Sequence, residues 1–149
     1  MTETTPNVAS RPADAQANGF ESVRLAHQNE MAEDYVELIA ELAEEHGEAR
    51  PVDIAKHLGV SQPTVSKNLG RLKRDGLVTH EPYRSVFLTD AGTALAETCR
   101  TRHRIVVSFL KALGISGDVA EHDAEGIEHH VSAETLEAFS TFVQSRGGD

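Results

Sequence analysis

The sequence VDIAKHLGVSQPTVSKNL, residues 52–69, has the pattern of two short helices joined by a tight turn. The apolar positions of the first helix recur at helical spacing and are Ile54, Ala55 and Leu58. Gly59 follows them, where a helix end often requires a left-handed residue. Ser61 is placed to cap the second helix, and Val60 and Val65 are expected to anchor that helix to a core.

The segments on either side extend this pattern to a winged helix-turn-helix. Upstream, apolar residues recur at helical spacing over residues 30–47, and downstream Gly76 ends the second helix of the motif. Two β-prone runs, residues 77–79 and 85–88, flank a polar turn and predict a hairpin.

The remainder of the chain is also predicted to be largely helical. Thr89 caps a long helix over residues 90–113, and shorter helices follow at residues 117–130 and 133–144. Residues 1–28 lack a sustained apolar period and predict a disordered tail. We therefore expect a mostly α-helical protein with one small β-hairpin.

Composition excludes several classes of protein. The chain has 149 residues and a net charge of −10, and 39% of its residues are hydrophobic, which suffices for a packed core. No apolar run reaches the roughly 18 residues of a membrane helix, so we expect no membrane association. We also expect no secretory signal. The single cysteine, Cys99, excludes a disulfide framework and fits a cytoplasmic location.

Charge is distributed unevenly along the chain. Residues 49–104 contain ten Lys and Arg against five Asp and Glu, whereas the remainder contains four against nineteen. This pattern fits a polyanion-binding middle and cation-binding flanks, although chance variation among solvated faces produces the same totals.

The second helix of the helix-turn-helix presents polar and basic residues that suit double-stranded DNA. A major groove admits one helix, and the N-terminal residues of that helix reach the base edges. We expect Gln62 and Thr64 to read bases, and Ser66, Lys67 and Arg71 to bind phosphates. The full set of predicted DNA contacts is Arg50, Ser61, Gln62, Pro63, Thr64, Ser66, Lys67, Arg71 and Arg84. A protein–protein module with a solvated helix face is the alternative.

A second constellation combines carboxylates with imidazoles. Its members are Asp34, Glu37, His103, Glu125, Glu128 and His129. The first two are spaced i, i+3, and the last three i, i+3 and i+4, so each group would share one face of a helix. Each piece alone is weak evidence, because acidic pairs are usually just solvated. Together, in a chain predicted to bind DNA, they suggest a sensor whose helices are joined by metal.

These motifs resemble the DtxR family of metal-dependent repressors, in particular its short manganese-responsive members without a C-terminal SH3-like domain. The resemblance covers residues 30–142. It is carried by EDYVE at 33–37, ARPVDIA at 49–55, VSQPTV at 60–65, RH at 102–103 and EGIEHH at 125–130. The wing departs from the family pattern at Ser85, where a glycine usually follows the arginine.

The resemblance implies that the six carboxylate and imidazole residues are the metal ligands, between the first, linker and fifth helices. It implies Mn(II) with two ions per subunit, and a homodimer on a near-palindromic operator. The domains would be a tail at 1–28, a winged helix-turn-helix DNA-binding domain at 29–92, and a linker helix with a helical metal-binding and dimerisation domain at 93–145. The expected function is repression of manganese-uptake genes, with activation of an exporter left open.

The ligand chemistry favours manganese. Four carboxylates and two imidazoles without sulfur suit the hard ion Mn²⁺, and four negative charges can neutralise two divalent ions. By the same resemblance, iron-sensing relatives are expected to carry Met and Cys at the positions of Asp34 and Glu125.

Other functions remain open at this point. They are a response to another divalent metal such as Fe(II), recognition of a small organic ligand as in MarR-like proteins, metal-dependent hydrolysis, and architectural DNA binding without a sensor. We do not expect an enzyme or a small organic substrate, because no further base, nucleophile or substrate-pocket motif accompanies the carboxylates.

Overall fold

The computed structural model describes residues 11–147, which form six helices and one two-stranded antiparallel sheet. The elements are α1 (Ala13–His46), α2 (Pro51–Leu58), α3 (Gln62–Arg74), β1 (Val78–Thr79), β2 (Phe87–Leu88), α4 (Asp90–Ala112), α5 (Gly117–Ile127) and α6 (Ala133–Ser145). In the sheet, Val78 pairs with Leu88 and Thr79 with Phe87. The mostly α-helical fold with one small hairpin is as the sequence predicts.

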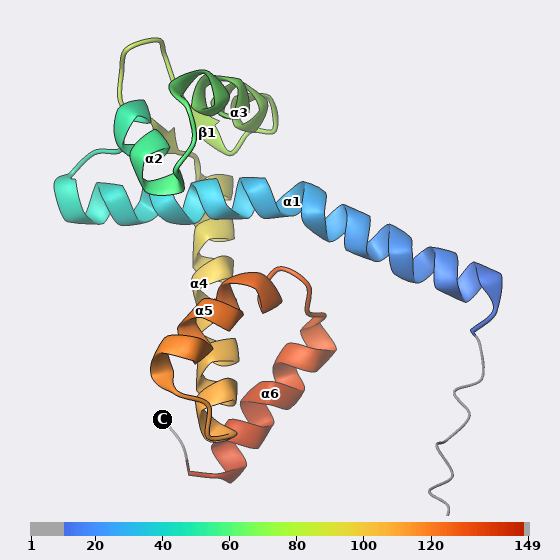
Figure 1. Ribbon diagram of the computed structural model, residues 1–149. Helices are drawn as coiled ribbons and strands as arrows, with labels where there is room; N and C mark the ends of the chain where they lie inside the picture. The colour runs from blue at the N-terminus through green and yellow to red at the C-terminus, as the bar shows by residue number, and fades with distance from the viewer. Residues whose placement is uncertain (1–10, 148–149) are drawn as a thin grey trace, which may run out of the picture.

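Helix α1 is much longer than predicted. It begins at Ala13, so the disordered tail expected over residues 1–28 is wrong for residues 13–28, and residues 1–10 lie outside the described part. The N-terminal half of α1 projects away from the other helices (Figure 1). Its large apolar residues Phe20, Val23 and Leu25 are exposed. Because no core packs against this half, it has no apolar period by which the sequence could reveal it.

The first hydrophobic core joins the C-terminal half of α1 to the helix-turn-helix and the hairpin. Its buried members include Tyr35 and Ile39 from α1 and Val65 and Leu69 from α3. Gly59 adopts a left-handed φ of 68° after α2, as its position predicts. The expectation for Val60 is wrong: its side chain is 39% exposed and does not anchor α3.

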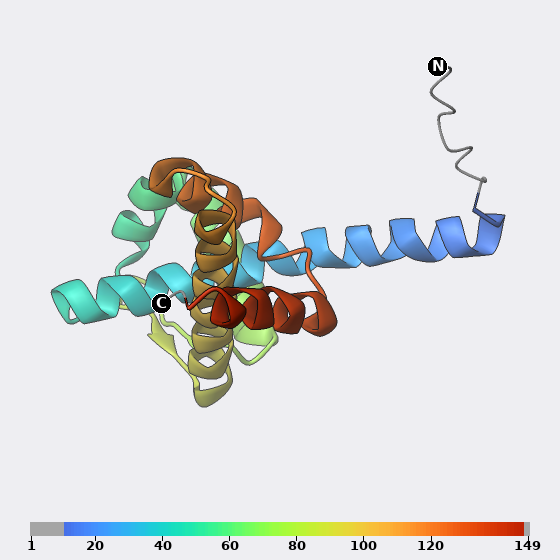
Figure 2. The same ribbon diagram turned by 90° about the horizontal axis from the view of Figure 1, so that it is seen from below.

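Helix α4 connects this core to a second one. Its N-terminus is fixed to the hairpin region, because Thr89 caps the helix at Gly92 N and donates a 2.7 Å hydrogen bond to the Gly76 carbonyl. Its C-terminal half packs with α5 and α6, where the rings of Phe109 and Phe139 stack 3.9 Å apart. Seen from below, α5 and α6 flank α4, while α1 crosses it (Figure 2). None of the helices in the described part of the chain combines the length and the hydropathy of a membrane-spanning segment.

Candidate metal centre and nucleic-acid interface

The junction between the two hydrophobic cores is polar. Among residues 11–147, the buried polar or charged residues are Glu33 on α1 and Glu128 and His129 in the turn that follows α5. Helix α5 ends at Ile127, so Glu128 and His129 do not lie on the continuous helical face that their spacing predicts. Burying such groups costs free energy unless each one finds partners, so their contacts define the site.

The first group of contacts is centred on His103 of α4. Its Nδ1 lies 2.7 Å from Glu128 Oε2 and 3.6 Å from Glu125 Oε1. Its Nε2 lies 2.6 Å from Glu121 Oε2. One ligand atom from each of His103, Glu125 and Glu128 lies within 4.8 Å of the other two, a spacing suited to a shared metal ion.

The second group is centred on His129. Its Nδ1 lies 2.6 Å from Glu33 Oε2, and its Nε2 lies 3.1 Å from Asp34 Oδ1 and 3.5 Å from Glu128 Oε1. The two oxygens of Glu128 therefore face different imidazoles, one in each group. Glu128 thus joins the turn after α5 to α4, and His129 joins the same turn to α1.

Glu37, the remaining predicted ligand, borders the same region. Together with His103 it lines a cavity of about 340 Å³ between α1, α4 and α5. Burial raises the pKa of the Glu37 carboxyl, and the negative charge of Glu125 raises it further. All six predicted metal residues thus lie around one junction, although Glu37 makes no ion pair there within the described residues.

The electrostatics of the centre are those of a cluster with excess negative charge. Burial raises the pKa of Glu128 to about 7, and the carboxylate of Glu125 adds to that rise. The carboxylates of Asp34 and Glu33 raise the pKa of His129 to about 10. Burial opposes protonation of His103, but hydrogen bonding to Glu121 and the charge of Glu128 outweigh it and raise the pKa of that ring.

The residues present fit a divalent cation. Glu128 Oε1 and His129 Nε2 are both buried and have no hydrogen-bond partner among the described residues. Asp34 Oδ1 is 3.1 Å from this nitrogen but does not meet it in hydrogen-bonding geometry. Buried polar atoms normally have hydrogen-bond partners, whereas these two have only ion-pair contacts, 3.5 Å from each other and, for the nitrogen, 3.1 Å from Asp34, which is an arrangement that a shared cation would complete. The donors are oxygens and imidazole nitrogens, as hard or borderline divalent ions require.

Two residues of the centre were missed by sequence reasoning. Glu121 lies four residues before Glu125, so i, i+4 spacing on α5 was an available signal for it. Glu33 likewise lies four residues before Glu37 on α1, but its contacts with His129 and with Arg102, 3.4 Å away, come only from the tertiary fold. Cys99 is buried, as expected of a core thiol, and burial raises its pKa to about 12.

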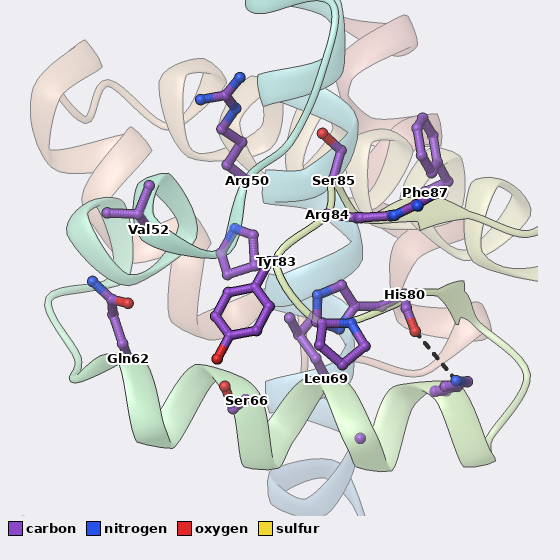
Figure 3. Close-up of a pocket in the computed structure, with 14 residues that line it drawn as sticks. Arg50, Val52, Gln62, Ser66, Leu69, His80, Tyr83, Arg84, Ser85 and Phe87 are labelled. Carbon is purple, nitrogen blue, oxygen red and sulfur yellow. Dashed lines mark hydrogen bonds between the residues drawn. The ribbon is translucent and has the colours of Figure 1, made fainter.

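The predicted DNA-binding side chains of α3 are all exposed. These are Gln62, Pro63, Thr64, Ser66, Lys67 and Arg71. Ser61 caps α3 through a 3.3 Å hydrogen bond that its Oγ accepts from Thr64 N, and the two hydroxyls lie 2.9 Å apart. A groove of about 1060 Å³ separates α3 from the wing, and Tyr83 extends over it toward Gln62 and Ser66 (Figure 3).

The two outlying arginines are paired with acids of their own segments. Arg50 Nε lies 2.6 Å from Glu48 Oε1, and Arg84 Nε lies 3.5 Å from Glu81 Oε2. Ser85, the departure at the wing, donates a 2.7 Å hydrogen bond to Glu48 Oε2. Glu48, which sequence reasoning missed, thus ties the wing to the start of α2. The unusual conformation falls instead on the exposed Tyr83, whose φ is 62°.

Comparison with known proteins identifies relatives along most of the chain. The model of the iron dependent repressor N-terminal DNA binding domain matches residues 28–86, and that of the iron dependent repressor metal binding and dimerisation domain matches residues 89–146. Transcriptional regulator MntR of Escherichia coli O157:H7 is 57% identical over 129 residues, which cover 87% of this chain and 83% of that protein. Its namesake from Salmonella typhimurium strain LT2 is 56% identical, with 87% and 82% covered.

Solved structures share the fold. The manganese regulator SloR has a TM-score of 0.67 and 32% identity over 76% of this chain, and a manganese-dependent transcriptional repressor in complex with manganese has a TM-score of 0.68 and 32% identity over 76%. This chain spans about half the length of each, 53% and 52%. With both family models matched in sequence order and identities above one half, the chain belongs to the iron-dependent repressor, or DtxR, family, as its motifs predicted.

Proposed function

We propose that this chain is a manganese-responsive transcriptional repressor that binds double-stranded DNA as a homodimer and silences manganese-uptake genes when Mn(II) is bound. It is a regulator and not an enzyme, acting in the cytoplasm. The names of its relatives as transcriptional regulators MntR support this role. The observation that carries the proposal is a pair of neighbouring buried ligand atoms, Glu128 Oε1 and His129 Nε2, that lack hydrogen-bond partners among the described residues and lie within a sulfur-free donor set.

The proposed ligands fall into two overlapping sets that suit two ions per subunit. The first comprises His103, Glu125 and Glu128, and the second comprises Asp34, Glu128 and His129, with Glu37 bordering both. The carboxylates of Asp34, Glu37, Glu125 and Glu128 offset the charge of two divalent ions. When bound, the metal supplies positive charge that offsets these carboxylates and joins the segments bearing them.

Contacts within the chain link the metal centre to the orientation of the helix-turn-helix. Glu128 and His129 follow α5, His103 lies in the middle of α4, and Asp34 and Glu37 lie on α1. Because the N-terminus of α4 is fixed to the hairpin region through Thr89, holding α4 against α1 holds the helix-turn-helix in a fixed orientation. In a homodimer this orientation sets the distance between two α3 helices, which must meet half-sites about 34–36 Å apart, or a multiple of that, on a near-palindromic operator.

The test is fluorescence anisotropy with a DNA duplex selected from a random pool in the presence of Mn²⁺. We expect binding that requires Mn²⁺, is reversed by a chelator, and weakens at least about tenfold in Glu128→Gln, because metal and DNA stabilise the same state. The control is His122→Ala, an exposed histidine of α5 whose side chain pairs, within residues 11–147, only with the neighbouring Asp123.

Equal affinity with and without metal would refute the co-repressor function. Parallel titrations with Fe²⁺ and Zn²⁺ separate a manganese response from a general divalent response. A response to none of these metals would favour an organic effector instead.

A further inference from the structure

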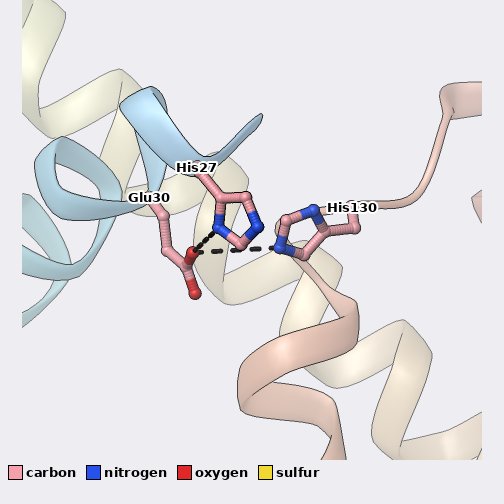
Figure 4. A group of neighbouring side chains, drawn as sticks. All are labelled: His27, Glu30 and His130. Carbon is pink, nitrogen blue, oxygen red and sulfur yellow. Dashed lines mark hydrogen bonds and ion pairs between the residues drawn. The ribbon is translucent and has the colours of Figure 1, made fainter. Parts of the chain in front are cut away.

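A cluster of three further ligand groups lies outside the centre already described. His27 and Glu30 come from α1, and His130 comes from the turn after α5, about a hundred residues later in the chain. One carboxylate oxygen, Glu30 Oε2, lies 3.3 Å from His27 Nδ1 and 3.8 Å from His130 Nε2. Figure 4 shows both rings turned toward this carboxylate, and their centroids are 4.9 Å apart in an edge-to-face arrangement.

We propose that His27, Glu30 and His130 form a second, separate metal site that takes a borderline divalent transition ion of the zinc class. One atom from each residue lies within 4.8 Å of the other two. Ligand atoms around tetrahedral Zn²⁺ are about 3.3–3.5 Å apart, given bond lengths of about 2.0–2.2 Å, so small side-chain rotations complete the set. Two imidazoles and one carboxylate, with a fourth position open to water, are an established protein ligand set for zinc.

The ligand chemistry differs from that of the carboxylate-rich centre. Imidazole-rich sites bind Zn²⁺ more tightly than Mn²⁺, which stands at the weak end of the divalent series. The three side chains are partly or largely exposed, with 63% of His27, 30% of Glu30 and 31% of His130 accessible. Solvent therefore has direct access to the site, and a fourth water ligand has room.

The local backbone structure positions all three ligands. His27 and Glu30 are spaced i, i+3 on α1, which places them on one face. His130 is positioned by its backbone N–H, which donates a 3.0 Å hydrogen bond to the Ile127 carbonyl. A metal here joins the projecting part of α1 to the turn that carries His129, and so braces two segments of the neighbouring centre from outside it.

Zinc binding by equilibrium dialysis tests the site in a Glu125→Gln/Glu128→Gln background, which weakens the carboxylate-rich centre. In that background, His27→Ala or His130→Ala should each lower the bound Zn²⁺ by about one equivalent per chain. His122→Ala is the matched control and should leave the stoichiometry unchanged, because this exposed histidine lies beside an acid but belongs to no three-ligand cluster in the described part of the chain. Co²⁺ substitution adds a second readout, an intense visible absorption typical of tetrahedral coordination that both variants should lose.

Far-ultraviolet circular dichroism verifies that each variant is folded. Both histidine variants are expected to fold, because His27 and His130 are exposed. Unchanged zinc stoichiometry in both variants would overturn the proposal and leave the cluster as an ion-paired surface contact. An equal loss in the His122→Ala control would also overturn it, because the binding would then be nonspecific surface coordination. None of these outcomes depends on whether Mn²⁺ controls DNA binding.

Discussion

At the scale of single residues, Glu128 is the least exposed charged residue among residues 11–147. Its side chain is 1% exposed, it contacts two imidazoles, and one of its oxygens lacks a hydrogen-bond partner within the described residues. In the metal-free protein, a carboxylate buried in this position lowers the free energy of unfolding, because its charge is incompletely compensated. The sequence motif EGIEHH marked the residue, but its burial and its bridging position depend on three segments meeting.

The raised pKa of Glu128 predicts how the stability of the metal-free protein depends on pH. The unfolded carboxyl ionises near its ordinary value of 4.5, whereas the folded one holds its proton up to about 7. As pH rises through that window, the unfolded state loses a proton that the folded state keeps, so the free energy of unfolding falls. The loss should be smaller in Glu128→Gln, by on the order of 1–3 kcal/mol.

Chemical denaturation at several pH values, with a chelator present, measures this difference. Glu137→Gln, on the exposed side of α6, serves as the control and should follow the wild-type profile. If the free energy of unfolding depends on pH in the same way in wild type and in Glu128→Gln, the pKa of Glu128 is not raised by burial. With saturating Mn²⁺ the wild type should become more stable than Glu128→Gln, because metal binding adds to the free energy of unfolding of the wild type and not of the variant.

At the scale of elements, the attachment of α4 to the hairpin decides whether the centre can position α3. Gly92 sits in the first turn of α4, against the chain between α3 and β1. A side chain there would overlap the Leu77 carbonyl oxygen, and Leu88 Cδ2 would lie only 3.2 Å from its Cβ. Backbone cannot yield as a flexible side chain can, so only glycine fits at this approach.

Gly92→Ala should therefore destabilise the protein by on the order of 1–3 kcal/mol and weaken the response of DNA binding to Mn²⁺. The matched control is Gly70→Ala in α3, where a Cβ would meet open space. That change should be neutral or stabilising by up to about 1 kcal/mol, because alanine is the better helix former. Urea denaturation of both variants measures the contrast, and equal free energies of unfolding would contradict the close approach.

How far the sequence predicted these elements depends on whether each one packs. The apolar periods of Tyr35 and Ile39 in α1 and of Val65 and Leu69 in α3 identified helices because those residues build the core. The N-terminal half of α1 was missed because its large apolar residues, such as Phe20, are exposed and do not belong to either core. Likewise, the contact between Glu33 and His129 joins residues 96 positions apart in the chain, which no local spacing encodes.

At the scale of the whole molecule, two hydrophobic cores are separated by a junction made of charged groups. One core holds the helix-turn-helix, and the other holds α5, α6 and the C-terminal half of α4, whose N-terminal cap is bonded to the chain beside the first core. An apolar junction would hold the two parts together permanently. A junction of carboxylates and imidazoles holds them firmly only when a cation balances its charge. Metal binding can therefore shift the protein toward one relative orientation of the two parts.

Hydrogen exchange of the whole chain tests this view of the junction. Local openings that need the cluster to separate become rarer when metal joins it, so Mn²⁺ should slow amide exchange around Glu33–Glu37, around His103, and in the turn from Glu128 to His130. Residues 13–25, whose side chains are exposed and far from the cluster, should exchange alike with and without Mn²⁺. Uniform protection along the chain would instead indicate general stabilisation, and protection confined to α5 would mean that the metal does not join α1 to α4.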